Sequence, residues 1–201
     1  MPNQSTSKSD YSFSTSISLL NRIQVKEATA WDRFAEIYTP LVLSWVRTAG
    51  LQPADAADVV QEVFCIIATK IENFRKEDPD ARFRAWLWGI TRNVLRQYFR
   101  THGKGPVAKG GSSAQHMIGN APEFLDAEQA PSSPDEDKAL TFRAMMTIKG
   151  DFEETTWQAF WLMTIEGKIA TEVAQELGMT SNAVRQAKYR VLCRLREEII
   201  D

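Results

Sequence analysis

The chain has 201 residues and a formal net charge of −2 at pH 7, so it has room for one large or two small domains, and any nucleic-acid binding must come from local basic patches. Its two cysteines, Cys65 and Cys193, lie far apart and indicate neither a disulfide framework nor a zinc site. There is no apolar run of membrane-spanning length and no apolar core of a signal peptide, so we expect a soluble, cytoplasmic chain without membrane insertion, metal or cofactor.

The first 102 residues are predicted to form a tail and a helical domain. Residues 1–16 are rich in Ser and Thr and lack periodicity, which is typical of a disordered tail. In residues 17–102, apolar residues recur at helical spacing in three stretches. The first runs from Trp31 to Val46 with a bend possible at Pro40, and the second begins near Pro53 or Asp55. The second stripe consists of Val60, Phe64, Ile67, Ile71 and Phe74, and the third of Phe83, Trp86, Leu87, Ile90 and Val94.

A change of composition divides the chain after this domain. Residues 103–132 are rich in Gly, Ala, Ser and Pro and are predicted to be a flexible linker. Ser133 and Pro134 then have the pattern of a helix start, and Asp151 with Glu154 offers a capping pair for a further helix. No strand pattern or internal repeat is present. The predicted fold class is all-α, with two small helical domains, residues 17–102 and 133–201, joined by the linker.

The stretch from Thr171 to Arg196 has the pattern of a helix-turn-helix. A short apolar helix that contains the small residue Ala174 ends at Gly178, which can adopt the positive φ of a tight turn. Thr180 can cap a second helix, whose stripe is Val184, Val191 and Leu195. In this motif the second helix enters the DNA major groove.

The second helix of this motif has a basic face of a single charge sign. No acid lies between Gly178 and Arg196, and the opposite face to the stripe carries Asn182, Arg185, Gln186 and Tyr189. Arg, Asn and Gln can read base edges with two hydrogen bonds. The alternative is a helical hairpin with a solvated basic face, but the uniform charge and the turn glycine favour DNA binding.

The third helix of the first domain combines basic and aromatic residues. No acid lies between Ala81 and Pro122, and the residues that lie away from the predicted core stripe are Arg84, Trp88, Arg92, Leu95, Arg96 and Phe99. Arginines neutralise phosphates and aromatic rings stack on unpaired bases, so the face suits single-stranded or melted DNA. The alternative, equally weighted for each aromatic residue, is that the ring packs against another helix.

Acidic residues share one face of the second helix. Asp55, Asp58 and Glu62 are three and four residues apart. They could form a solvated face or a docking face for a basic partner protein. A metal site usually needs a Glu-x-x-His partner, and the only histidines, His102 and His116, lie at or beyond the edge of the predicted linker. No nucleophile–base arrangement, phosphate loop or Cys/His cluster is visible, so we do not expect an enzyme.

Together these segments resemble sigma factors of bacterial RNA polymerase. Asp55 to Phe64, DAADVVQEVF, resembles the family segment DAxDxxQEVF, and Phe83 to Arg100 is similar to the family helix FxxWLxxIxRNxxxDxxR. The C-terminal helix-turn-helix resembles the fourth conserved region. Two such regions joined by a linker are the pattern of the extracytoplasmic-function (ECF) group, and the resemblance covers about residues 17–102 and 133–199.

The resemblance implies a role for each segment. The first domain would bind core RNA polymerase and recognise and melt the minus-ten element, and the second would read the minus-thirty-five element of promoter DNA. The implied polymerase-binding residues are Asp55, Asp58, Gln61 and Glu62. The implied minus-ten residues are Arg84, Trp88, Arg92, Asn93, Arg96 and Arg100, helped by the loop from Glu72 to Arg82. The implied minus-thirty-five residues are Thr180, Ser181, Asn182, Arg185, Gln186, Tyr189, Arg190 and Arg194.

The chain departs from the family pattern at Gln97, where an Asp is common, and in its long glycine-rich linker. An anti-sigma factor is a further candidate partner. Two other functions fit parts of the sequence. A stand-alone helix-turn-helix regulator would leave the basic-aromatic helix of the first domain unexplained, and a helical metalloenzyme would lack its histidine ligands.

Overall fold

The computed structural model describes residues 18–74, 83–102, 125, 130–131 and 133–199, and within these ranges it is all-helical, without strands. The predicted tail, most of the predicted linker and residues 75–82 of the predicted minus-ten loop lie outside the described residues. The all-α fold class is therefore confirmed for the described part of the chain.

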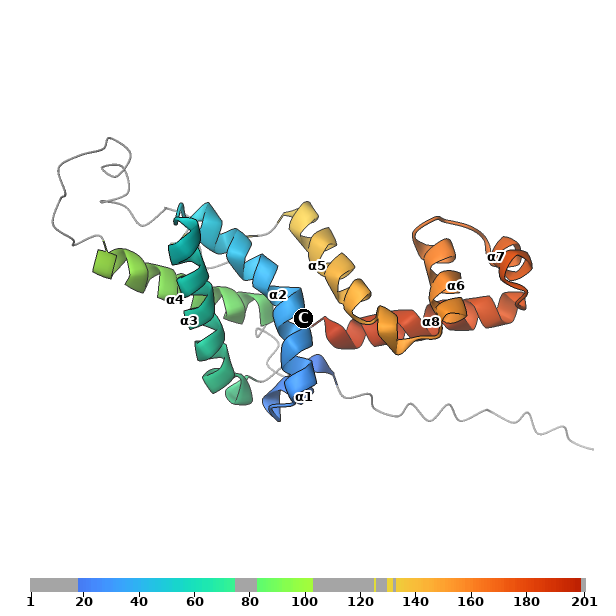
Figure 1. The fold of residues 1–201 in the computed structure, drawn as a ribbon, viewed down its shortest axis with the longest axis horizontal. Helices are drawn as coiled ribbons and strands as arrows, with labels where there is room; N and C mark the ends of the chain where they lie inside the picture. The colour runs from blue at the N-terminus through green and yellow to red at the C-terminus, as the bar shows by residue number, and fades with distance from the viewer. Residues whose placement is uncertain (1–17, 75–82, 103–124, 126–129, 132, 200–201) are drawn as a thin grey trace, which may run out of the picture.

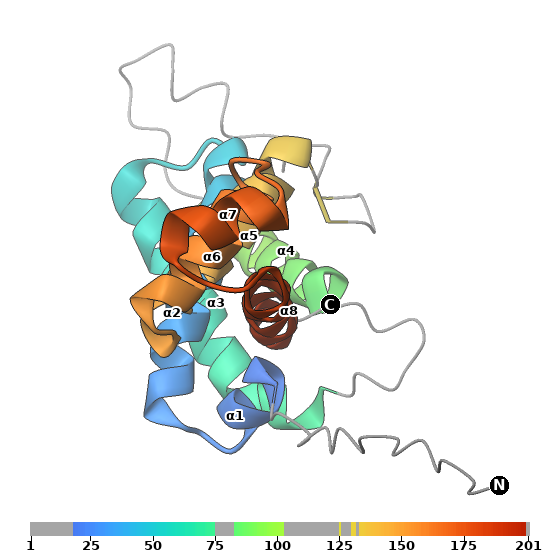
Figure 2. The same cartoon turned by 90° about the vertical axis from the view of Figure 1, so that its right-hand side faces the viewer.

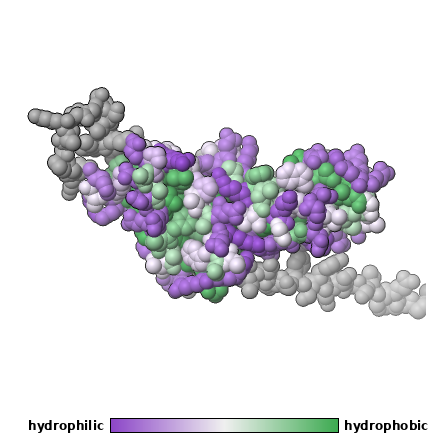
Figure 3. Space-filling view, in the orientation of Figure 1, coloured by the Kyte–Doolittle hydropathy of each residue, from purple (hydrophilic) through white to green (hydrophobic). Residues whose placement is uncertain are grey.

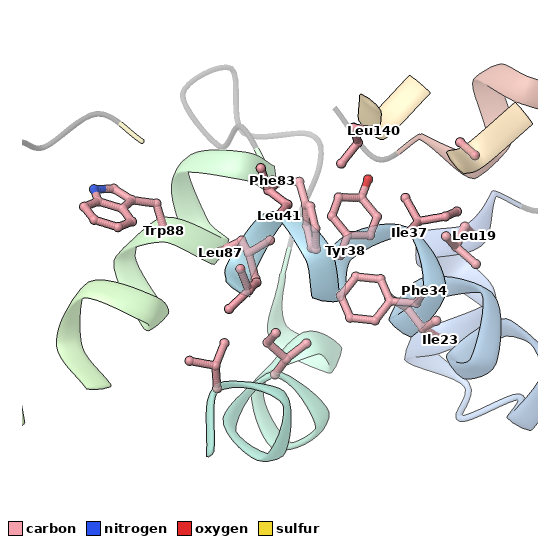
Figure 4. Close-up of a cluster of buried hydrophobic side chains, with 14 of the residues drawn as sticks. Leu19, Ile23, Phe34, Ile37, Tyr38, Leu41, Phe83, Leu87, Trp88 and Leu140 are labelled. Atoms are coloured by element: carbon pink, nitrogen blue, oxygen red, sulfur yellow. The ribbon is translucent and has the colours of Figure 1, made fainter. Parts of the chain in front are cut away.

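The described residues of the first half form four α-helices and one short 3₁₀ helix around an aromatic core. They are α1 (Leu19–Gln24), α2 (Ala28–Thr48), α3 (Pro53–Lys70), η1 (Ile71–Asn73) and α4 (Phe83–His102). The rings of Phe34, Tyr38 and Phe83 contact one another with centroids 4.9–5.9 Å apart, and Figure 4 shows them between α2 and α4. The short helix α1, which sequence periodicity did not indicate, buries Leu19 and Ile23 completely.

One predicted stripe in this half is displaced. On α3 the fully packed residues are Val59, Val63 and Ile67, whereas Val60 and Phe64 are only half-buried. The buried face is thus rotated by one residue along the first two turns, and the predicted stripe is correct only from Ile67 onward. Pro40 lies inside α2, which continues past it.

The second half consists of α5 (Pro134–Thr147), η3 (Lys149–Asp151), α6 (Glu154–Thr164), α7 (Ala170–Leu177) and α8 (Ser181–Glu198). The predicted start at Ser133 is confirmed, because its hydroxyl accepts a 3.1 Å hydrogen bond from the Glu136 backbone N–H. The predicted capping role of Asp151 is wrong. Glu153 precedes α6 without a side-chain cap, and Asp151 pairs with Arg33 and Arg194 instead.

The two halves meet along α2 and α5 (Figures 1 and 2). Helix α5 packs against α2, and the end of α8 reaches α1. One buried cluster runs from Leu19 and Trp45 through Leu140 to Phe160 and Leu195, so apolar packing continues from one half into the other. Helix α7 and the start of α8 lie at the end of the molecule remote from α3 and α4 (Figure 1). The division into two domains at residues 103–132 stays a prediction.

Candidate nucleic-acid interface

The helix-turn-helix pattern has the expected local geometry. Gly178 ends α7 with a φ of 64°, and the Met179 N–H donates a 2.9 Å hydrogen bond to the Ala174 carbonyl. Thr180 caps α8, because its hydroxyl accepts a 3.1 Å hydrogen bond from the Ala183 N–H. Ala174 and Ala187 are buried in a small apolar cluster between α6, α7 and α8, so these helices cross closely.

The predicted reading residues lie together on one side of α8. Asn182, Arg185 and Gln186 are exposed along its first half, together with Tyr189, which is 54% exposed, and Arg190 is exposed just past the midpoint. At the helix start Thr180 is exposed and Ser181 half-buried. Arg190 also donates to the Thr156 hydroxyl of α6 at 3.4 Å. This part of α8 therefore presents Asn, Arg and Gln side chains, which are of the types that can read base edges, at the end of the molecule remote from α3 and α4.

Arg194 has different surroundings from the other basic residues of α8. Its guanidinium pairs with Asp151 at 3.2 Å, with Glu197 at 3.4 Å and with the fully buried Glu198. Glu198 also lies 3.1 Å from Arg33 of α2, so Arg194 belongs to an ion-pair cluster between the halves. The hydrogen bond from Arg33 holds the pKa of Asp151 below its ordinary value.

On α4, the predicted minus-ten residues differ in accessibility. Asn93, Arg96 and Arg100 are exposed and Arg92 is half-buried. Arg96 also donates a 2.8 Å hydrogen bond to the Leu125 carbonyl. Gln97, which stands where the family often has an acid, accepts a hydrogen bond from Arg100. The exposed end of α4 thus keeps a polar, cationic surface without an acidic side chain.

Trp88 is placed in the core, which is the alternative that the sequence left open for each aromatic residue. Its side chain is 0% exposed and packs edge-on against Trp45, with ring centroids 5.5 Å apart. Figure 4 shows Trp88 and Leu87 leaving α4 in different directions, and both are buried. Leu95 is also buried, so α4 is covered on two sides and Trp88 is not available to stack on a base in this structure.

Arg84 lies at the start of α4 and is held by the second half of the chain. Its guanidinium pairs with Asp137, donates a 2.9 Å hydrogen bond to the Pro131 carbonyl and lies 3.5 Å from Glu136. It also lies 5.8 Å from the centroid of the Trp45 ring, within cation–π range. Arg84 is therefore enclosed by partners that the sequence did not indicate.

The acidic residues of α3 lie on the surface, as the sequence predicts. Asp58, Gln61 and Glu62 are exposed, and Asp55 is half-buried. Burial, and then a hydrogen bond with Asp55, raise the pKa of Tyr98 on α4 to about 12. No group of residues that could hold a metal ion occurs within the described ranges, and no helix there is long and apolar enough to cross a membrane.

Comparison with known proteins identifies related chains. Residues 34–105 match the family model "Sigma-70 region 2". The chain is 24% identical over 176 residues to the ECF RNA polymerase sigma factor BldN of Streptomyces coelicolor, a match that covers 87% of this chain and 62% of BldN. It is 27% identical over 187 residues to the ECF RNA polymerase sigma factor SigD of Mycobacterium tuberculosis, covering 88% and 82% of the two chains.

Two further matches differ in how much of each chain they cover. The chain spans only 34% of the probable RNA polymerase sigma factor RfaY of Xanthomonas campestris. A chain in a solved structure of an RsbN–BldN complex is 20% identical, with coverage of 88% and 96% and a TM-score of 0.34, too low to support a structural comparison. The region 2 match covers residues 34–105, and the ECF relatives align over most of the sequence, so the chain is similar to ECF sigma factors of RNA polymerase.

Proposed function

We propose that this chain binds core RNA polymerase, directs it to promoters and takes part in melting the DNA. The observation that carries the proposal is the row of exposed Asn, Arg and Gln side chains on α8. This row follows a glycine turn and a capped helix start, in a chain that is similar to ECF sigma factors. The mechanism is recognition and strand separation in the cytoplasm, without a covalent step. An anti-sigma factor is a further candidate partner.

Polymerase binding is assigned to the acidic face of α3. Asp58, Gln61 and Glu62 are exposed there, and half-buried Asp55 lies one turn earlier. Exposed carboxylates on a rigid helix suit a basic partner surface, where they set the rate and orientation of association more than its strength. The face also matches the family segment from Asp55 to Phe64.

Contact with the minus-ten element is assigned to α4. Asn93, Arg96 and Arg100 are exposed, and Arg92 and Arg84 are half-buried. Trp88 is left out of this set because it is fully buried. Extruding a base costs a few kcal/mol, which phosphate contacts from these arginines can offset.

Contact with the minus-thirty-five element is assigned to the start of α8. Arg185 and Gln186 lie near the helix start, where base contacts concentrate in this motif. Thr180, Ser181, Asn182, Tyr189 and Arg190 surround them. Arg194 is farther along and already paired, so its role would be phosphate contact after those pairs are exchanged.

Run-off transcription tests the proposal. Core polymerase with genomic template fragments should give new transcripts only when the chain is added. The double charge reversal Asp58→Lys, Glu62→Lys should weaken core binding, because it inverts the exposed face of α3. The matched control is Asp32→Lys, Glu36→Lys, which reverses two exposed acids at the same spacing on α2.

The control variant should bind core as the unaltered chain does, with circular dichroism confirming that both variants stay helical. Unchanged core affinity of the α3 variant would contradict the docking assignment. Specific binding of a palindromic DNA site by a homodimer, with no transcription from added core, would instead support the stand-alone regulator.

A further inference from the structure

The acidic first turn of α5 contacts the basic start of α4. This turn contains Asp135, Glu136 and Asp137, and the last two of them pair with Arg84. Glu136 is fixed from the other side as well, since it accepts a 2.7 Å hydrogen bond from the Ser44 hydroxyl of α2. The Arg84 guanidinium thus meets two carboxylates from a segment about fifty residues later in the chain.

Neighbouring residues hold the two sides of this contact in place. The Trp45 indole N–H donates a 3.2 Å hydrogen bond to the Pro131 carbonyl, the same carbonyl that accepts from Arg84. Leu140, one turn along α5, is buried in the shared apolar cluster. The carboxylates are therefore held at Arg84 by backbone and apolar contacts as well as by charge.

A second ion-pair cluster lies at the other end of the contact between the two halves. Arg33 of α2 donates to both carboxylate oxygens of Asp151, at 2.9 and 2.5 Å, and lies 3.1 Å from Glu198. Arg22 lies 3.7 Å from the same Glu198. Hydrophilic side chains occupy much of the surface where the halves meet (Figure 3). Together the two clusters hold α5 and the end of α8 against the first half of the chain.

We propose that the first turn of α5 is an internal competitor of DNA for the start of α4. This inference rests on the proposed function, because it requires α4 to bind nucleic acid. Carboxylates and phosphate oxygens accept the same bidentate hydrogen bonds from a guanidinium. Arg84 can satisfy one or the other, so DNA engaging this end of α4 displaces Glu136 and Asp137. Linkage is reciprocal, and DNA therefore also loosens α5 from α2.

The competition is measurable with the full-length chain and a short fluorescein-labelled oligothymidine, by fluorescence anisotropy. Asp137→Asn should bind the oligonucleotide about twofold to fivefold more tightly than Asp135→Asn, as expected for the loss of one partly exposed ion pair. Asp135→Asn is the matched control: it removes the same charge from the same turn, but Asp135 is 94% exposed and pairs with Lys138 of its own helix. In an Arg84→Ala background the difference between the two variants should vanish.

A distance measurement provides the second readout. Spin labels on Cys65 of α3 and on Thr141→Cys of α5, with Cys193→Ser, report the separation of the halves, and both labelled sites are exposed. Saturating oligonucleotide should increase the mean distance between the two labels or broaden the distribution of that distance. If Asp137→Asn and Asp135→Asn bind the oligonucleotide equally well, or if their difference persists in the Arg84→Ala background, the proposed competition is wrong. The assignment of DNA binding to α4 would still stand. Absence of oligonucleotide binding by every variant would overturn the α4 assignment as well.

Discussion

Trp88 shows how one side chain can carry two plausible roles in a sequence. Its spacing places it away from the stripe of Phe83, Leu87 and Ile90, next to arginines, which suits base stacking. The structure instead packs it on Trp45, whose indole N–H is bonded to Pro131. Helical periodicity identifies one buried face of α4 but not the second, because the second depends on contacts with a distant segment.

Truncation of Trp88 should therefore act on stability. Trp88→Ala is expected to lower the free energy of unfolding by about 3–5 kcal/mol, because it leaves a cavity in a fully buried site. Urea unfolding followed by circular dichroism measures this loss. Trp88→Phe keeps an aromatic ring and should cost less. A Trp88→Ala chain of unaltered stability that binds unpaired DNA poorly would return this residue to the DNA-binding set.

At the scale of elements, local chemistry in the sequence predicts helix ends well. Ser133, Thr180 and Gly178 all take the roles that their residue types favour. Asp151 was misassigned because a carboxylate before a helix can cap it or pair with a distant arginine, and only the fold decides between these. The six-residue helix α1 was missed because so short a segment shows little periodicity.

The turn glycine allows a sharp test of the helix-turn-helix geometry. Gly178 has a φ of 64°, and a Cβ added there would meet nothing within 4 Å, so Gly178→Ala should cost about 1–2 kcal/mol through backbone strain alone. Gly89, inside α4, also has open space but no positive φ. Gly89→Ala should instead stabilise the protein by about 0.5–1 kcal/mol. Equal effects of the two substitutions in thermal or urea unfolding would contradict the left-handed turn.

For the whole molecule, the least predictable feature is the junction between the halves. Asp137 and Arg84 are 53 residues apart, and Arg33 and Asp151 are 118 apart. No periodicity or local motif connects residues at such separations. The sequence therefore indicates which surfaces are basic or acidic, and the polar side chains predicted to be exposed on α8 are exposed. That this face of α8 reads DNA stays a prediction. It does not indicate that Arg84 and Arg194 are neutralised within the chain.

The junction should depend on pH through Asp151. Arg33 holds the pKa of this carboxyl below its ordinary value of 3.8, so its folded form favours the charged state. The resulting stabilisation is complete above the ordinary pKa and is lost as the pH falls through the lower folded pKa. At neutral pH, Asp151→Asn should lower the free energy of unfolding by about 1 kcal/mol. The difference in the free energy of unfolding between this variant and the unaltered chain should decrease as the pH falls below about 4.

Urea unfolding across this pH range, at low and high salt, measures the gap. Salt should reduce it at neutral pH, because both partners are partly exposed and their attraction is screened. Asp135→Asn provides the control, since that carboxylate is nearly fully exposed and should show little dependence on either variable. A gap for Asp151→Asn that stays constant down to the acid limit would show that Asp151 contributes by packing, and that the charge pair with Arg33 does not hold the two halves together.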